Sequence, residues 1–214
     1  MTDNRKAGIA LIAGSMGGVL TMAIHPAGVG RLNPDSLQRL IWVSGIAHTL
    51  ALVSVLLLFL GTCGLTHRLA APDRIAFSAL VTFGFSAVAI MIAGAVSGWI
   101  VPGILTLSVR DVAANASQWE IATASIFQIN QAMSKIYSVG TSLAITLWSV
   151  SVLRQGDWSR GIAVFGCVTA PLIALLIFAG HLRLHVHGMA IVMLSQVLWF
   201  VGIGIGLMGE DHAR

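Results

Sequence analysis

The sequence predicts an all-α, polytopic integral membrane protein, a bundle of six transmembrane helices that form a single domain over residues 1–214. The first observation is composition: 57% of the residues are hydrophobic and only 9% are charged, against about half and about a quarter in an average soluble domain. The second is that the charges fall in short islands between long uncharged runs. This composition excludes an ordinary soluble enzyme, a disordered chain and a secreted disulfide scaffold.

Each uncharged run is long enough to cross a bilayer, because about 20 residues at 1.5 Å rise span about 30 Å of hydrocarbon. The runs are continuously apolar rather than alternating, which favours helices over a membrane β-barrel. Lys135 is the one charge inside a run. The runs cover residues 7–30, 40–67, 75–109, 121–153, 161–182 and 184–209.

Prolines and capping residues set the predicted helix ends. Pro26 stops the first helix, and Ser36 is a candidate N-cap for the second. Pro102 and Gly103 interrupt the third helix, and Ser117 opens a capping box, Ser-Gln-Trp-Glu, for the fourth. The predicted helices cover residues 7–25, 36–66, 74–100, 117–153, 160–181 and 186–208.

The fourth predicted helix is longer than a bilayer is thick. No proline occurs between Ser117 and Leu153, and a helix of about 36 residues is about 54 Å long. We therefore expect its first turns to stand above the membrane or to lie on its surface.

The basic residues near the ends of the runs predict the orientation, since cytoplasmic loops carry an excess of Lys and Arg. We expect both termini in the cytoplasm and a membrane of the bacterial inner, or cytoplasmic, type. The predicted cytoplasmic side holds the larger set, Arg5, Lys6, Arg68, Arg74, Arg154, Arg160 and Arg214, and the opposite side holds Arg31, Arg39, Arg110 and Arg183.

Glycines spaced four residues apart let helices approach closely in a membrane, where lipid gives no hydrophobic drive for association. We interpret these pairs as packing contacts within the bundle, with a dimer face as the alternative. The pairs are Gly14/Gly18, Gly94/Gly98 and Gly202/Gly206.

Polar side chains inside the spans are the best functional clue, because each one is costly in lipid unless it faces protein or water. His48 and Lys135 fall at a similar predicted depth in the outer half of the bundle. Gln128, Gln131 and Lys135 share one helix face, at i, i+3 and i+7, and we expect His48 to point toward that face or toward water.

These positions predict a polar cavity that opens to the extracytoplasmic side. The alternatives are long side chains that reach the membrane interface and contacts between subunits. The candidate cavity residues are His25, His48, Gln128, Gln131, Lys135 and Tyr137.

The outer histidines are a weaker candidate for a metal site. His181 and His185 stand at i and i+4, which on a helix places both imidazoles on one face, and His25 could supply a third ligand. The spans contain no Asp or Glu that could act as a catalytic carboxylate. A haem would need a second histidine at the depth of His48, and the sequence shows no obvious one. We therefore expect no cofactor, with a metal ion as the alternative.

The function predicted from these features is binding or permeation of a small molecule or ion through the outer polar cavity. The alternatives are an accessory subunit of a membrane complex and a metal-dependent membrane-embedded enzyme that uses the outer histidines. The expected partners are the lipid bilayer, a small solute, and a homo-oligomer or a larger membrane complex. The cations are too scattered to predict nucleic-acid binding.

Overall fold

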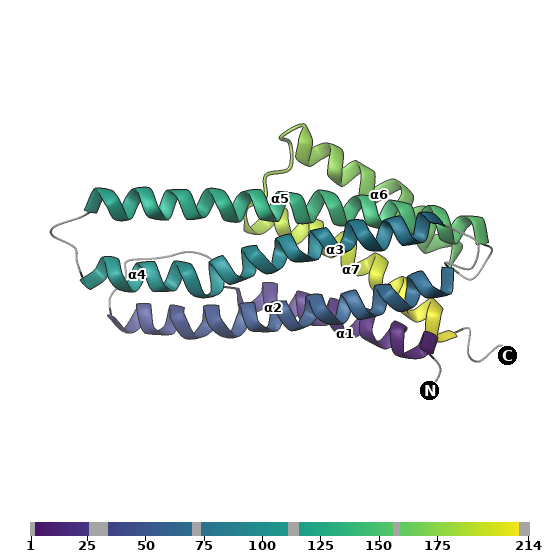
Figure 1. Cartoon of the computed structure of the whole chain (residues 1–214), viewed down its shortest axis with the longest axis horizontal. Helices are drawn as coiled ribbons and strands as arrows, with labels where there is room; N and C mark the ends of the chain where they lie inside the picture. The colour runs from purple at the N-terminus through teal and green to yellow at the C-terminus, as the bar shows by residue number, and fades with distance from the viewer. Residues whose placement is uncertain (1–2, 26–33, 70–73, 111–115, 156–158, 210–214) are drawn as a thin grey trace.

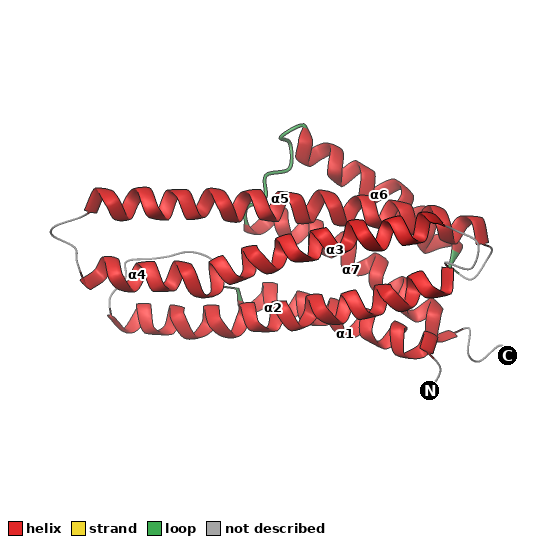
Figure 2. Cartoon of the chain, in the orientation of Figure 1, coloured by secondary structure: helices red, strands yellow, loops and turns green. Residues whose placement is uncertain are grey.

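The computed structural model describes residues 3–25, 34–69, 74–110, 116–155 and 159–209, and every regular element in these residues is helical (Figure 2). The elements are α1 (Asp3–Ile24), α2 (Pro34–Leu69), α3 (Arg74–Ala95), a π-helical segment η1 (Val96–Ile100), α4 (Val101–Arg110), α5 (Ala116–Gln155), α6 (Arg160–Phe178) and α7 (Val186–Gly209).

Six of the described helical stretches are long and apolar enough to cross a membrane, which confirms the predicted fold class. The third stretch runs without interruption from Arg74 to Ser108, so α3, η1 and α4 act as one helix. Pro26, where the first helix is predicted to stop, lies outside the described residues, and α1 ends at Ile24.

The helices form two packed groups, one of α1, α2 and α7 and one of α3, α5 and α6, and the contacts of α2 with α3 and of α6 with α7 join them. α1 packs against α2 and α7, and α5 packs against α3 and α6. α2 also packs against α3, so α3 lies between α2 and α5 (Figure 1). This order decides which polar faces meet in the outer half of the molecule.

A cluster of buried aromatic side chains fills the bundle centre. Trp148 and Trp199 stack with ring centroids 6.0 Å apart, and Phe83 and Phe200 pack edge to face at 5.8 Å. Buried indole N–H groups need acceptors, and Trp199 Nε1 donates to Ser149 Oγ at 2.9 Å. Large apolar side chains also cover the outside of the bundle, as expected where lipid is the solvent.

Glycines bring α1 against its two neighbours. A methyl group on Gly8 would lie 2.5 Å from the carbonyl oxygen of Gly204 in α7, so the two backbones touch there. A methyl group on Gly14 would lie 2.8 Å from the carbonyl oxygen of Ser54 in α2. Gly14 therefore serves as a packing contact within the bundle, as its spacing predicts.

Three of the six membrane-length stretches are much longer than the others. The stretch of α2 has 35 residues, the continuous stretch of α3, η1 and α4 has 35, and that of α5 has 39. The stretches of α1, α6 and α7 have 22, 19 and 23 residues. The ends of α2, α4 and α5 continue together beyond the rest of the bundle (Figure 1). We call residues 34–44, 96–110 and 116–130 the outer extension, because the sequence predicts that this end of the bundle faces the extracytoplasmic side.

The third predicted helix does not end near Pro102, because the π turn accommodates the proline. The N–H of Val101 donates to the carbonyl of Val96, one residue further back than in an α-helix. The helix then continues through Pro102 to Arg110. A proline inside a helix is tolerated where local π geometry and neighbouring side chains satisfy the freed carbonyl.

Candidate functional site

Polar side chains from α1, α2, η1 and α5 meet where the outer extension joins the bundle. We call His25, Ser44, His48, Ser97 and Asn130 the outer polar cluster. The His25 and His48 rings are in edge contact, with centroids 5.2 Å apart, so His48 does have a histidine neighbour that the sequence alone did not indicate.

His48 is held in one orientation. Its side chain is 5% exposed, and its Nδ1 lies 2.7 Å from the carbonyl oxygen of Ser44. A carbonyl can only accept, so Nδ1 carries the proton and donates it. In the neutral ring, Nε2 is then the nitrogen with the lone pair, the one able to accept a proton or to bind a cation.

The Ser44 hydroxyl supplies a hydrogen bond that the π turn leaves unmade. In this turn Val101 donates to Val96, and Pro102 has no N–H, so neither residue satisfies the carbonyl of Ser97. The Ser44 hydroxyl donates to that carbonyl at 3.0 Å. The proline within an otherwise apolar run is the sequence signal that could have located this bond.

Gly98 gives His48 its place against η1. A methyl group at position 98 would lie 2.6 Å from His48 Cβ, so only glycine lets the two helices meet at this depth. The Gly94/Gly98 pair identified in the sequence thus includes a direct contact with the cluster.

Asn130 ties α5 to the same turn. Its Nδ2 donates to the carbonyl of Ala93 at 3.1 Å and also to Ser97 Oγ. The Ser134 hydroxyl lies 3.5 Å from Asn130 Oδ1, at the limit of a hydrogen bond. The cluster therefore crosses from α1 through α2 and η1 to α5.

Three of the predicted cavity residues lie elsewhere on α5. Gln128 and Lys135 are exposed and Gln131 is half-buried, and Lys135 Nζ lies 6.0 Å from the Phe178 ring of α6. The packing order explains this, because α5 turns toward α3 and α6 while α2 turns toward α1 and α3. A cavity shared by His48 and Lys135 stays a prediction.

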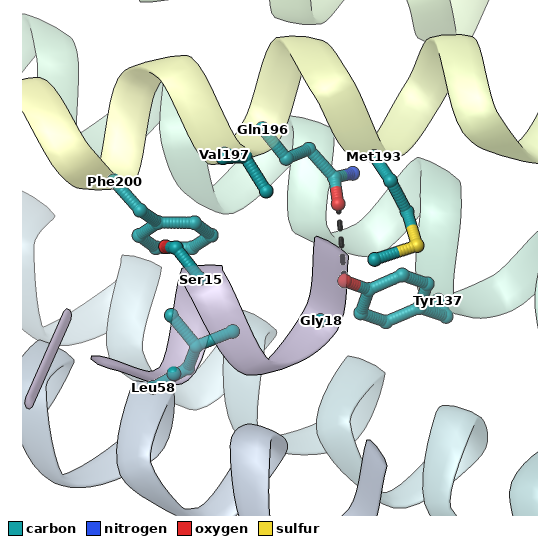
Figure 3. Close-up of a pocket in the computed structure, with 9 residues that line it drawn as sticks. Ser15, Gly18, Leu58, Tyr137, Met193, Gln196, Val197 and Phe200 are labelled. Atoms are coloured by element: carbon teal, nitrogen blue, oxygen red, sulfur yellow. Dashed lines mark hydrogen bonds between the residues drawn. The ribbon is translucent and has the colours of Figure 1, made fainter. Parts of the chain in front are cut away.

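Tyr137 lies deeper, beside a small cavity in the bundle. Its hydroxyl donates to Gln196 Oε1 at 3.0 Å (Figure 3). The cavity has a volume of about 20 Å³ and lies among α1, α2, α5 and α7. Gln196 was not among the predicted site residues, although it is one of the few strongly polar side chains in the last uncharged run.

The candidate metal ligands are not arranged on one helix face. α6 ends at Phe178 and α7 begins at Val186, so His181 and His185 lie in the connection between these helices. Outside a helix, an i, i+4 spacing does not place two side chains on one face. Gly180, at φ +75°, ends the helix in the left-handed region that glycine favours. His185 contacts His187, with ring centroids 5.8 Å apart.

Within the part of the chain that the structure describes, no three His, Cys, Asp or Glu side chains lie close enough to hold a metal ion. His25 contacts His48, whereas the sequence analysis grouped it with His181 and His185. A metal ion at His25, His181 and His185 stays a prediction without support from this geometry.

The fold and the cluster together define a multi-pass integral membrane protein with an interhelical polar cluster at a π turn. No family model, no curated protein and no solved structure matches the chain.

Proposed function

We propose that this membrane protein binds a small polar molecule or an ion at the outer polar cluster, from the extracytoplasmic side. The observation that carries the proposal is the contact of buried His48 with His25, joined by hydrogen bonds from α2 through η1 to α5. Ionisable side chains such as histidine are rare within membrane-spanning segments, and they often mark substrate or ion pathways.

The chemistry of the cluster supports binding of a polar ligand. His48 offers the lone pair of Nε2, because Nδ1 is committed to the Ser44 carbonyl. His25 follows the last residue of α1 and is only half-buried, whereas its neighbour His48 is buried. π turns within α-helices occur frequently at functional sites.

Permeation is the second step of the proposal and needs a change of structure. Inward of the cluster, the bundle is filled by buried aromatic side chains that include Phe83, Trp148 and Trp199. A solute bound at the cluster would cross only if helices move, as in carriers where a site near mid-membrane opens to each side in turn.

The test uses the full chain reconstituted into liposomes, with flux of H⁺, K⁺ and glycerol measured by internal dyes and light scattering. We expect flux of one of these probes above that of empty liposomes. His48→Leu should lower it at least about tenfold, which is a change of about 1.4 kcal/mol in the free energy of binding or passage. The matched control is His187→Leu, at an exposed outer histidine, which should keep the flux.

His48→Leu should still fold, because its Nδ1 bond lies within one turn of α2 and leucine suits a buried site in a membrane protein. Circular dichroism of the same samples checks this. Flux equal to that of empty liposomes for every probe, from folded wild-type protein, would overturn the proposal.

An accessory subunit of a membrane complex is the second candidate, and the outer extension favours it. Trp42, Ile121 and Phe127 in the extension are 65%, 68% and 58% exposed. Large apolar side chains beyond the membrane thickness are typical of surfaces that bind another protein. Absence of flux, together with a native particle containing a second kind of subunit, would favour this candidate.

A further inference from the structure

The separation of His25 and His48 is the one that two ligands of a single metal ion have. Their ring centroids lie 5.2 Å apart, with the ring planes at 66°. Two imidazoles on one tetrahedral ion, with metal–nitrogen distances of about 2.1 Å, have ring centroids about 5.2 Å apart. The chain thus already holds the two rings at the separation that a shared ion requires.

The hydrogen bond of His48 is the kind that metal-binding histidines make. Its Nδ1 donates to the Ser44 carbonyl oxygen at 2.7 Å, which leaves the lone pair on Nε2. Histidines that bind a metal almost always donate their other ring N–H to a backbone carbonyl, a carboxylate or water. Because the His48 side chain also packs directly against Gly98 of η1, this ring is oriented before a ligand arrives.

His25 can supply the second nitrogen and give the ion access. It follows the last residue of α1 and is half-buried, whereas His48 is 5% exposed. A side chain at the end of a helix and partly open to solvent can change its rotamer, so a ring nitrogen of His25 can turn toward His48 Nε2. Water can then reach an ion between the two rings and complete its coordination.

The donors select the class of ion. Imidazole suits Zn²⁺, Cu²⁺ and Ni²⁺, whereas Mg²⁺ and Ca²⁺ take carboxylate and carbonyl oxygens. Within the described residues, no third His, Cys, Asp or Glu joins the pair. A haem does not fit between these two rings, because its axial histidines lie on opposite faces of the macrocycle and these rings are in contact.

We propose that the outer polar cluster binds one divalent transition-metal ion, with His25 and His48 Nε2 as its protein ligands and water in the remaining positions. This inference rests on the proposed function and names the class of ion that the site takes. A structural zinc site has four protein ligands. Two ligands without a carboxylate hold the ion weakly enough to release it, as a site on a passage must.

The first test measures Zn²⁺ binding to the full chain in detergent, by equilibrium dialysis at buffered free Zn²⁺. We expect a single site that excess Ca²⁺ does not compete for. His25→Leu and His48→Leu should each weaken binding at least about tenfold, because either change leaves one protein ligand. Circular dichroism checks that both variants are folded, and a folded wild-type chain that binds no Zn²⁺ would overturn the proposal.

The exposed pair His185 and His187 is the matched control, because these rings are also in edge contact, with centroids 5.8 Å apart. The double variant His185→Leu, His187→Leu should keep the Zn²⁺ site. Binding that is lost in this double variant, and is kept in both His25→Leu and His48→Leu, would assign the ion to the outer connection and overturn the proposal.

The second test leaves the cluster unaltered, so it stands if His48→Leu fails to fold. X-ray absorption at the zinc edge is recorded on the Zn²⁺-loaded His185→Leu, His187→Leu chain, and the fine structure counts the imidazole ligands. We expect two imidazole nitrogens at about 2.0–2.1 Å, with oxygens in the other positions. A shell without imidazole, or with one or three, would overturn the proposal.

The flux measurement separates this inference from the proposed function. Flux of H⁺, K⁺ or glycerol that depends on His48, in a chain that binds no Zn²⁺, would overturn the metal site and leave the proposed function standing. Zn²⁺ held by two imidazoles, and lost in His25→Leu, would support the metal site whichever of these probes crosses.

Discussion

At the scale of single residues, the Ser44 hydroxyl compensates for what Pro102 lacks. The carbonyl of Ser97 receives its hydrogen bond at 3.0 Å from a different helix, because the π turn sends the Val101 N–H to Val96. The bond thus holds α2 to η1 at the depth of His48. Ser44 therefore stabilises the α2–η1 contact and also positions His48, the candidate ligand-binding histidine.

Ser44→Ala is expected to destabilise the protein by about 1–3 kcal/mol, since it leaves the Ser97 carbonyl without its donor. The control is Ser78→Ala, because the Ser78 hydroxyl is exposed and bonds only to the Arg74 carbonyl of its own helix. Denaturant titration of both variants in detergent measures the difference in the free energy of unfolding.

Pro102→Ala provides the internal check on this mechanism. Alanine restores an N–H at position 102 that can donate to the Ser97 carbonyl. The Ser44→Ala change should therefore cost less in a Pro102→Ala background than in the wild-type chain. Equal costs in the two backgrounds would show that the hydroxyl has another role.

At the scale of the helices, glycines bring the backbone of α1 against both of its neighbours. Gly8 and Gly204 meet backbone to backbone, and Gly14 lies against the backbone of α2. Lipid is as apolar as the side chains, so it gives no hydrophobic drive for association, and membrane helices depend on close van der Waals packing of this kind. The same close approach sets α1 beside α7 and so frames the small cavity beside Tyr137.

Gly8→Ala should destabilise the α1–α7 contact by about 1–3 kcal/mol, because the added methyl group would lie 2.5 Å from the Gly204 carbonyl oxygen. Gly45→Ala is the matched control, since a methyl group there meets nothing within 4 Å in the described part of the chain. It should be neutral or stabilising by up to about 1 kcal/mol through helix propensity. Thermal unfolding of the two variants checks the difference, and equal effects would contradict the contact.

At the scale of the whole molecule, the helix lengths predict that the outer extension stands beyond the hydrocarbon or lies on the membrane surface. α5 has 40 residues, about 60 Å of helix against about 30 Å of hydrocarbon. The shorter α1, α6 and α7, with 22, 19 and 24 residues, are close to the length that spans a bilayer, and they do not reach into the outer extension (Figure 1). We therefore expect the outer polar cluster to lie near the membrane boundary.

Cysteine labelling tests this placement in a Cys63→Ala, Cys167→Ala background. Ser125 and Leu143 are both exposed on α5, and they lie about 44 Å and about 17 Å along the axis from Arg154. We expect Ser125→Cys to react with a membrane-impermeant maleimide on intact cells. Leu143→Cys should stay unreactive even after permeabilisation, because it faces hydrocarbon.

Arg154→Cys completes the experiment by testing the side. With a cytoplasmic inner end, it should react only after the cells are permeabilised. Reaction of Arg154→Cys on intact cells would reverse the predicted orientation, and an unreactive Ser125→Cys would place the extension within the membrane.

The sequence by itself determined the fold class and the approximate helix positions, because span length and charge placement depend only on local composition. It also singled out His25, His48 and Tyr137 as polar positions, because a polar side chain in an apolar run is visible without knowledge of neighbours. The continuation through Pro102 was missed, since its compensation comes from Ser44, far away in the chain.

Only the tertiary structure decided which polar residues meet. Periodicity shows which residues share a face of one helix, but it carries no information about which helix that face contacts. In the packed bundle His48 contacts His25 and lies against the π turn, whereas Lys135 lies beside Phe178 of α6. The same packing, through the close approach at Gly8 and Gly204, brought α1 beside α7 and created the small cavity at Tyr137, which no local pattern could reveal.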